Sequence, residues 1–244
     1  MDQVNIYFVL LSLLAEIIGT IGGFGSSVYF VPIAAFFLPF DQVLGLTALY
    51  HLFSNITKVG LFREGLDIKL LWQIGAPSIV FVVIGGWLSG EFDKVILEYI
   101  LYSFLLFFSL AMILRPDLRL EANAVNGMLG GSISGFAAGL LGTGGAIRGL
   151  TMSAYTMTIQ GFVATSAAID LGIDLARSIV YFGEGYLVKE ILIYLPLLLI
   201  ISIVGSATGK YLLKYFTIEN FRKFSLTSIL LIALLGATKL LSGN

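Results

Sequence analysis

The 244-residue chain contains no cysteine and a single histidine, His51, and these shortages exclude several kinds of chemistry. Without cysteine there are no disulfides, thiol nucleophiles or cysteine-ligated metals, and no redox compartment is indicated. A lone histidine excludes a multi-histidine metal centre. Charged residues are also scarce, at 12% against about 25% in ordinary globular chains. We expect no metal, no other cofactor and no nucleic-acid partner.

The chain is rich in hydrophobic residues. Hydrophobic residues make up 58% of the chain, and the mean hydropathy is +0.97. This composition predicts an integral membrane protein, most of which faces lipid or lies inside a membrane bundle. The hydrophobic runs are long and lack period-two alternation, so they favour helices over a barrel. The N-terminus lacks the basic region of a secretory signal, and we expect the first hydrophobic run to be retained.

The hydrophobic runs divide into ordinary spans and longer segments, since about 20 apolar residues cross a bilayer. The ordinary spans are 43–62, 69–88, 95–114, 161–182, 187–213 and 221–241. Two segments, 6–38 and 122–158, are too long for one crossing. Each contains a glycine-rich interruption, GGFGSSV from residue 22 and GTGGAIRG from residue 142.

The two halves of the chain are related by a shift of 120 residues. Under that shift Gly25 meets Gly145, and the EG turn at 64–65 meets the EG turn at 184–185. Internal repeats of this kind are common in transporters. We therefore predict an all-α, polytopic membrane protein of two homologous repeats, 1–120 and 121–244. Each repeat has a glycine-broken helical hairpin followed by three transmembrane helices.

The positions of Lys and Arg predict that the two repeats are inverted. If each broken segment enters and leaves the membrane on one side, eight basic residues lie on one side of the membrane and three on the other. If each broken segment crosses once, the division is six to five. The positive-inside rule therefore favours hairpins, with the N-terminus outside.

The interruptions are the predicted substrate site. Glycine frees N–H groups from the helical ladder, and at membrane depth these groups must meet protein or a water-filled cavity. The helices that resume also present the positive ends of their dipoles, which favours an anion. The predicted binding residues are Gly22, Gly23, Gly25, Ser26, Ser27, Gly142, Thr143, Gly144, Gly145 and Arg148.

Close helix packing is the alternative reason for glycine in membrane helices. We prefer it for four glycines at four-residue spacing, which predict a ridge against a neighbouring helix. They are Gly127, Gly131, Gly135 and Gly139. For the two interruptions we prefer a ligand role, because they recur at matching positions and carry hydroxyl groups.

Two spans carry buried polar residues at the spacing i, i+4, i+7, on one face of each helix. They are His51, Asn55 and Lys58 in one span and Asp170, Asp174 and Arg177 in the other. Asp174 and Arg177 are predicted to pair. These six residues either form a packed polar interface that holds the two halves in register or belong to the transport machinery. In the second case Arg177 or Lys58 attracts the anion, and Asp170 or His51 carries a coupling proton.

Several of these segments resemble the TauE/SafE family of sulfite and organosulfonate exporters. GGFGSSVYFVPI and GLLGTGGAIRGLTM resemble its glycine-rich segments. ATS at 164–166, REGLDIKLLW at 63–72 and the segment 212–241 resemble a tripeptide, a turn and the closing helix of the family. Ala146, Arg148 and Met152 stand where the family has glycine, an apolar residue and proline. The resemblance implies export of a small sulfur oxyanion or sulfonate, driven by an ion gradient.

Arg148 is the strongest single candidate for binding the anion, because it lies on the first turn after the second interruption. Its guanidinium is suited to bind a sulfonate through two hydrogen bonds. The alternative is that it snorkels or pairs with Glu16, the only acid in the first segment. Glu64 and Glu184 lie beside glycine at span ends and are predicted to be solvated.

The leading hypothesis is a secondary transporter, not an enzyme, that exports sulfite or an organosulfonate with a coupling proton or cation. A small-carboxylate transporter is the alternative within transport. A membrane-embedded enzyme is disfavoured because HExxH, GxSxG, Walker and GxGxxG motifs are missing. A non-transporting subunit is the third alternative. We expect a multi-pass protein of a prokaryotic inner membrane, and leave open whether it forms a homo-oligomer.

Overall fold

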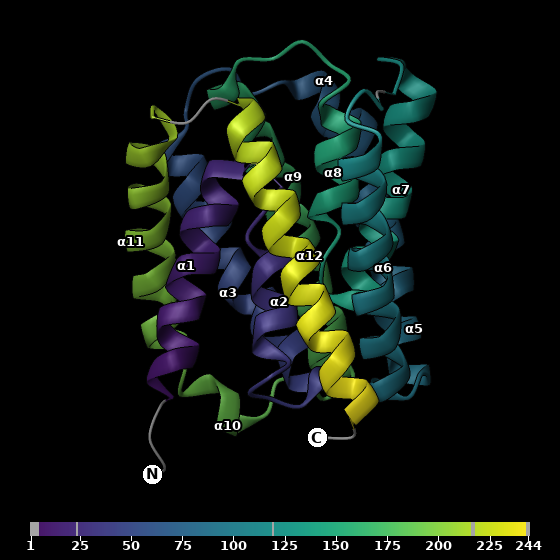
Figure 1. Ribbon diagram of the computed structural model, residues 1–244, viewed down its shortest axis with the longest axis vertical. Helices are drawn as coiled ribbons and strands as arrows, with labels where there is room; N and C mark the ends of the chain where they lie inside the picture. The colour runs from purple at the N-terminus through teal and green to yellow at the C-terminus, as the bar shows by residue number, and fades with distance from the viewer. Residues whose placement is uncertain (1–4, 23, 119, 216–217, 243–244) are drawn as a thin grey trace.

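The computed structural model describes residues 5–22, 24–118, 120–215 and 218–242, which form helices and loops with no β-strand among them (Figure 1). The first half contains α1 (Ile6–Gly22), α2 (Ser27–Ala34), α3 (Phe40–Leu61), α4 (Ile68–Leu70), the π-helical turn η1 (Leu71–Gly75), α5 (Ala76–Glu91) and α6 (Lys94–Leu114). The second contains α7 (Ala124–Leu141), α8 (Gly145–Met152), α9 (Ile159–Gly183), α10 (Lys189–Leu192), α11 (Leu195–Leu213) and α12 (Ile218–Ser242). The all-α prediction is confirmed.

Six helical stretches in the described part of the chain are long and apolar enough to cross a membrane. They are 68–91, 94–114, 124–141, 159–183, 195–213 and 225–242. The prediction of a multi-pass membrane protein is therefore confirmed. α3, which covers the predicted span 43–62, is not among them. It carries polar side chains that are buried within the protein, namely Thr47, His51, Ser54, Asn55 and Lys58.

Two predicted spans are each divided beside a proline. The span 69–88 is interrupted by η1, and the span 187–213 divides into α10 and α11. Pro77 and Pro196 lie in the first turns of α5 and α11. A proline has no N–H to donate and crowds the carbonyl four residues earlier, so the preceding turn widens into a π-turn or ends.

Polar residues in the loops begin several helices. Their side-chain oxygens accept hydrogen bonds from first-turn N–H groups, which have no partner inside the helix. Asp93 accepts from Val95 N at 2.8 Å, Asn123 from Asn126 N at 2.8 Å and Thr158 from Gly161 N at 3.0 Å.

Both glycine-rich interruptions are present. One separates α1 from α2, and the other separates α7 from α8. Gly25 and Gly142 have φ values of +82° and +77°, a left-handed conformation that glycine adopts without a steric penalty. α2 packs against α1, and α8 packs against α7. Each broken segment is therefore a long helix followed by a short one that contacts it.

The two short helices lie at different levels of the bundle. In Figure 1, α8 lies near the top and α2 below the middle. α4 lies at the top, whereas α10 and both ends of the chain lie at the foot. Elements that the 120-residue shift relates, such as α4 and α10, thus lie at opposite ends of the molecule.

The predicted glycine ridge on α7 packs against α5 and η1. A Cβ atom at Gly131, Gly135 or Gly139 would overlap the backbone carbonyls of Ile74, Ser78 and Val82 respectively. The fourth glycine, Gly127, lies beside the Tyr155 hydroxyl, 2.8 Å from where its Cβ would be. These glycines allow the helix backbones to touch, as expected for small residues at four-residue spacing.

Candidate functional site

Six charged side chains form three buried ion pairs at the centre of the bundle. The pairs are Lys58 with Glu16, Arg177 with Asp174, and Arg148 with Asp170. They come from α1, α3, α8 and α9, so both halves of the chain contribute. Intramembrane charges are costly unless paired, and they mark functional pathways in membrane proteins. The three pairs therefore locate the candidate site.

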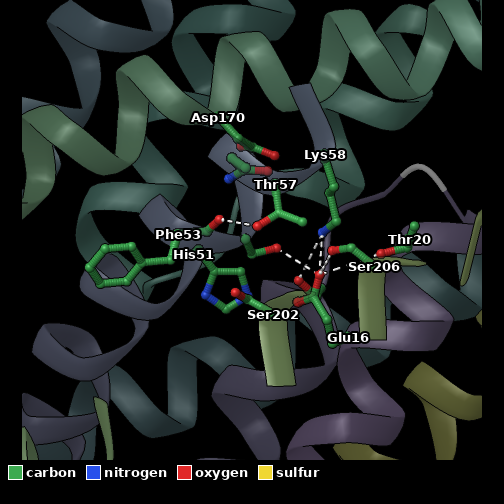
Figure 2. A network of polar contacts seen from close by, with 12 residues as sticks. Glu16, Thr20, His51, Phe53, Thr57, Lys58, Asp170, Ser202 and Ser206 are labelled. Atoms are coloured by element: carbon green, nitrogen blue, oxygen red, sulfur yellow. Dashed lines mark hydrogen bonds and ion pairs between the residues drawn. The ribbon is translucent and has the colours of Figure 1, made fainter. Parts of the chain in front are cut away.

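Glu16 on α1 accepts more hydrogen bonds than its ion pair alone supplies (Figure 2). The Lys58 ammonium lies 2.9 Å from Glu16 Oε1. Hydroxyl groups from α1, α3 and α11 complete the set: Ser54 at 2.6 Å, Ser206 at 2.8 Å, Tyr50 at 3.1 Å and Thr20 at 3.4 Å. A fully buried carboxylate remains charged only when a counter-charge and several hydrogen bonds compensate for the lost hydration.

Arg177 and Asp174 form the pair that the sequence predicts, with Arg177 Nη2 2.7 Å from Asp174 Oδ1. Asn55 Nδ2 donates to the other carboxylate oxygen at 2.7 Å. Arg177 Nη1 donates to the Gly142 carbonyl at 2.6 Å, just beyond the end of α7. This pair therefore ties α3 and α9 to the second interruption.

Arg148 pairs with Asp170 on α9, and not with Glu16 as the alternative interpretation proposed. Its Nε also donates to the Ser166 hydroxyl at 3.2 Å. Glu16 is paired with Lys58 instead. The Arg148 side chain is only 1% exposed, whereas Asp170 is 17% exposed.

A small cavity opens beside these pairs. Its volume is about 220 Å³ including its open mouth. It is lined by Gly19, Thr20, Gly25, Asn55, Lys58, Val163, Ser166, Ala167 and Asp170. The lining brings together the first interruption, α1, α3 and α9. Four of the predicted site residues line it: Gly25, Asn55, Lys58 and Asp170.

The other residues of the first interruption lie close to this cavity. Ser26 is buried, with its hydroxyl 3.4 Å from the Lys58 ammonium. Ser27 is half-buried and its hydroxyl lies 3.3 Å from that of Thr143. Gly22 is half-buried at the end of α1. Gly23 lies outside the described residues.

The second interruption is buried in protein. Gly142, Thr143, Gly144 and Gly145 are all buried, and none of them lines the cavity. Gly144 packs against the Ser134 carbonyl, and Gly145 packs against the Phe24 carbonyl of the first interruption. The two interruptions thus meet, but they differ: the first borders the cavity and the second supports it.

His51 also lies away from the cavity lining. Its Nδ1 lies 2.9 Å from the Thr47 carbonyl oxygen, and its ring packs edge-on against Tyr50 and Phe30. Its Nε2 has no hydrogen-bond partner in the described structure. Figure 2 shows its ring beside the Glu16 cluster rather than beside Asp170.

Several residues of the site are not anticipated by the sequence reasoning. Thr20 and Ser166 line the cavity, while Ser54 and Ser206 hold Glu16. Ser166 belongs to the ATS segment noted in the sequence, and that segment is the available signal. Other serines in hydrophobic helices donate to a carbonyl of their own helix, as Ser12 does. The sequence alone does not distinguish such a serine from one that donates to a buried carboxylate.

The cavity lining carries one cationic side chain, Lys58, and one carboxylate, Asp170. No group of three or more His, Asp or Glu side chains within metal-binding distance occurs in the described residues. Two cationic side chains, Lys58 and Arg148, border the cavity or its lining residues. Ligand sites at interrupted helices within a bundle of apolar helices are typical of secondary transporters.

The fold is that of a multi-pass helical membrane protein. The family model described as sulfite exporter TauE/SafE matches residues 8–236 of the chain. The protein therefore belongs to the TauE/SafE family of membrane exporters. No curated protein and no solved structure matches the chain.

Proposed function

We propose that this protein is a secondary transporter that exports a small sulfur-containing anion, sulfite or an organosulfonate, and holds it at the first interruption. The observation that carries the proposal is the position of Arg148. Its side chain is 1% exposed, and its Nη2 lies 3.3 Å from where a Cβ of Gly25, a residue of the cavity lining, would be. A cation buried at a glycine-formed wall is suited to recognise an anion.

The start of α2 adds further donors to this site. Ser26 precedes α2 and makes no side-chain cap, so the first N–H groups of α2 have no capping partner from it. These groups and the helix dipole favour negative charge. Lys58, 3.4 Å from the Ser26 hydroxyl, supplies a second positive charge. A sulfur oxyanion has enough oxygens to contact Arg148, Lys58 and the helix start together.

The second interruption is assigned a supporting role in this proposal. Gly144 precedes α8 without a side-chain cap, but its surroundings are protein. Gly142, Thr143 and Gly145 position α8, and α8 carries Arg148. The predicted substrate residues of the second interruption therefore act by placing the guanidinium, while Gly25, Ser26 and Arg148 contact the anion.

The inverted-repeat architecture is also part of the proposal. Supporting it, Gly65 and Gly185 are related by the 120-residue shift and have similar φ values of +80° and +76°. The short helices α4 and α10 lie at opposite ends of Figure 1. With the basic side inside, the N-terminus lies outside a prokaryotic inner membrane. A proton or cation carried by Asp170 or His51 is the proposed coupling partner.

Flux of sulfite into proteoliposomes tests the proposal. We expect the wild type to carry sulfite well above empty vesicles. Arg148→Gln should lower the flux by about tenfold or more, the effect of losing a charge-assisted hydrogen bond. Arg63→Gln is the matched control, because Arg63 is exposed and its Nε donates to the nearby Gly60 carbonyl at 2.9 Å, away from the site. Wild-type flux equal to that of empty vesicles would contradict the proposal.

A small-carboxylate transporter is the second candidate, and one observation favours it. The carboxylate of Asp170 is itself bound to the Arg148 guanidinium. The site therefore accepts carboxylate geometry. Thermal stabilisation of the purified protein by sulfite, methanesulfonate and acetate separates the two candidates: stabilisation by acetate alone favours the second.

A further inference from the structure

The three buried carboxylates differ in how firmly they are held. Glu16 is 0% exposed and surrounded by Lys58 and four hydroxyls. Asp174 is 2% exposed and accepts from both Arg177 and Asn55. Asp170 is 17% exposed, is held by Arg148 and lines the cavity. Asp170 is therefore the carboxylate best placed to leave its partner.

Arg148 has unused bonding capacity. Its Nε donates to Ser166 and its Nη2 to Asp170, but its Nη1 has no hydrogen-bond partner in the described residues. A buried donor on a charged group that lacks a partner is costly. The guanidinium is thus incompletely satisfied by the protein alone, and a ligand with several acceptor atoms would satisfy it better.

The pair packs against Gly25, which lines the cavity together with Asp170. A Cβ at Gly25 would lie 3.3 Å from Arg148 Nη2 and 3.4 Å from Asp170 Oδ2. Asp170 therefore lines the cavity, whereas Arg148 lies behind Asp170 and Gly25. An anion in the cavity meets the carboxylate first and reaches the guanidinium by displacing it.

We propose that Asp170 is a built-in competitor for the transported anion: its carboxylate occupies Arg148 when the site is empty, and the anion displaces it. This inference rests on the proposed function and adds to it a residue that sets affinity. Asp170 accepts from Nη2 alone, so an anion that accepts from both Nη2 and the unpartnered Nη1 replaces it with one hydrogen bond more. The site therefore selects oxyanions with at least two free oxygens and rejects halides such as chloride.

Sulfite binding to purified Asp170→Asn tests the competition. Removing the carboxylate should tighten sulfite binding by about tenfold or more, because displacement of a charge-assisted bond no longer opposes it. Asp117→Asn is the matched control, since Asp117 is exposed in the loop after α6 and belongs to none of the three ion pairs. Unchanged or weaker sulfite binding by a folded Asp170→Asn protein would overturn the inference.

Arg148→Gln, alone and combined with Asp170→Asn, separates this inference from the proposed function. If Asp170 acts by competing for Arg148, the gain from Asp170→Asn disappears when Arg148 is absent. The same gain in both backgrounds would mean a general charge effect and would overturn the competition. Undiminished sulfite binding by Arg148→Gln would instead contradict the proposed function.

Two measurements on the wild type keep the inference testable if a variant does not fold. Infrared difference spectra should show a change in a carboxylate band when sulfite binds, as Asp170 leaves the guanidinium. Chloride at matched ionic strength should neither produce that change nor compete with sulfite. A carboxylate signal unchanged by bound sulfite, or displacement of sulfite by chloride, would overturn the inference.

Discussion

The side-chain hydroxyls of Ser27 and Thr143 lie 3.3 Å apart, although 116 residues separate them in the sequence. Ser27 begins α2 and Thr143 lies just before α8, so this contact joins the two glycine-rich interruptions. Gly145 packs against the Phe24 carbonyl beside it. In transporters built from two repeats, access to the site changes when one repeat moves against the other. A movement of one half of this chain against the other would separate Ser27 from Thr143.

A disulfide between these positions should therefore stop transport. The chain has no native cysteine, so Ser27→Cys/Thr143→Cys introduces a single thiol pair. The two hydroxyl oxygens, 3.3 Å apart, lie where the sulfur atoms would be, so an approach of ~1 Å brings the thiols to the disulfide bond length. We expect oxidation to abolish sulfite flux and a reductant to restore it. Each single-cysteine variant is the control, and full flux through the oxidised double variant would show that the interruptions do not separate during transport.

Gly25→Ala should weaken sulfite binding by about tenfold. The substitution forces alanine into a left-handed conformation, at a cost of about 1–2 kcal/mol, and places a methyl group against Arg148 and Asp170. Gly185→Ala is the matched control, because Gly185 has φ +76° but its Cβ would meet no atom within 4 Å among the described residues. Calorimetric titration of both variants separates loss of the site from strain alone: equal affinities would remove Gly25 from the site.

Glu16→Gln should destabilise the protein by about 3–5 kcal/mol, because it leaves the Lys58 ammonium buried without its counter-charge. Lys58→Met removes the opposite partner. The double variant should be more stable than Glu16→Gln, since no unpaired charge remains. Unfolding in a denaturing detergent, followed by circular dichroism, measures the three free energies. Additive losses would show that the two side chains do not stabilise each other.

Gly135→Ala should lower the free energy of unfolding by about 1–3 kcal/mol through overpacking. Its methyl group would overlap the backbone of Ser78 on α5, which has no freedom to move aside. Gly60→Ala on α3 is the control, because a Cβ there meets no described atom within 4 Å. We expect it to be neutral or stabilising by up to ~1 kcal/mol, the helix preference of alanine over glycine. Equal thermal stability of both variants would contradict close contact between α5 and α7.

The sequence predicts the helices and their interruptions well, because both follow from local properties. Long apolar runs, glycine clusters and four-residue spacing are read directly along the chain. The Asp174–Arg177 pair is predictable for the same reason, as its members lie one turn apart on α9. The divisions beside Pro77 and Pro196 carry a local signal as well, although hydropathy alone treats each as one span.

The partners of Arg148 and Glu16 depend on tertiary structure and are therefore not readable from spacing. Arg148 reaches Asp170 because α8 packs against α9, and Glu16 reaches Lys58 because α1 lies near α3. The unequal burial of the two interruptions has the same origin. Their sequences suggest equivalent roles, but the protein around α8 covers the second one.

The three ion pairs join three cationic side chains to three carboxylates, so their formal charges cancel. An empty carrier with these pairs intact would change its access without moving net charge through the electric field of the membrane. A carrier loaded with an anion would move that anion's charge, which is worth about 2.3 kcal/mol per unit charge at 100 mV. A voltage that is negative inside would then accelerate the outward step of the anion, and the return step would respond to the voltage only through the charge of a coupling proton or cation.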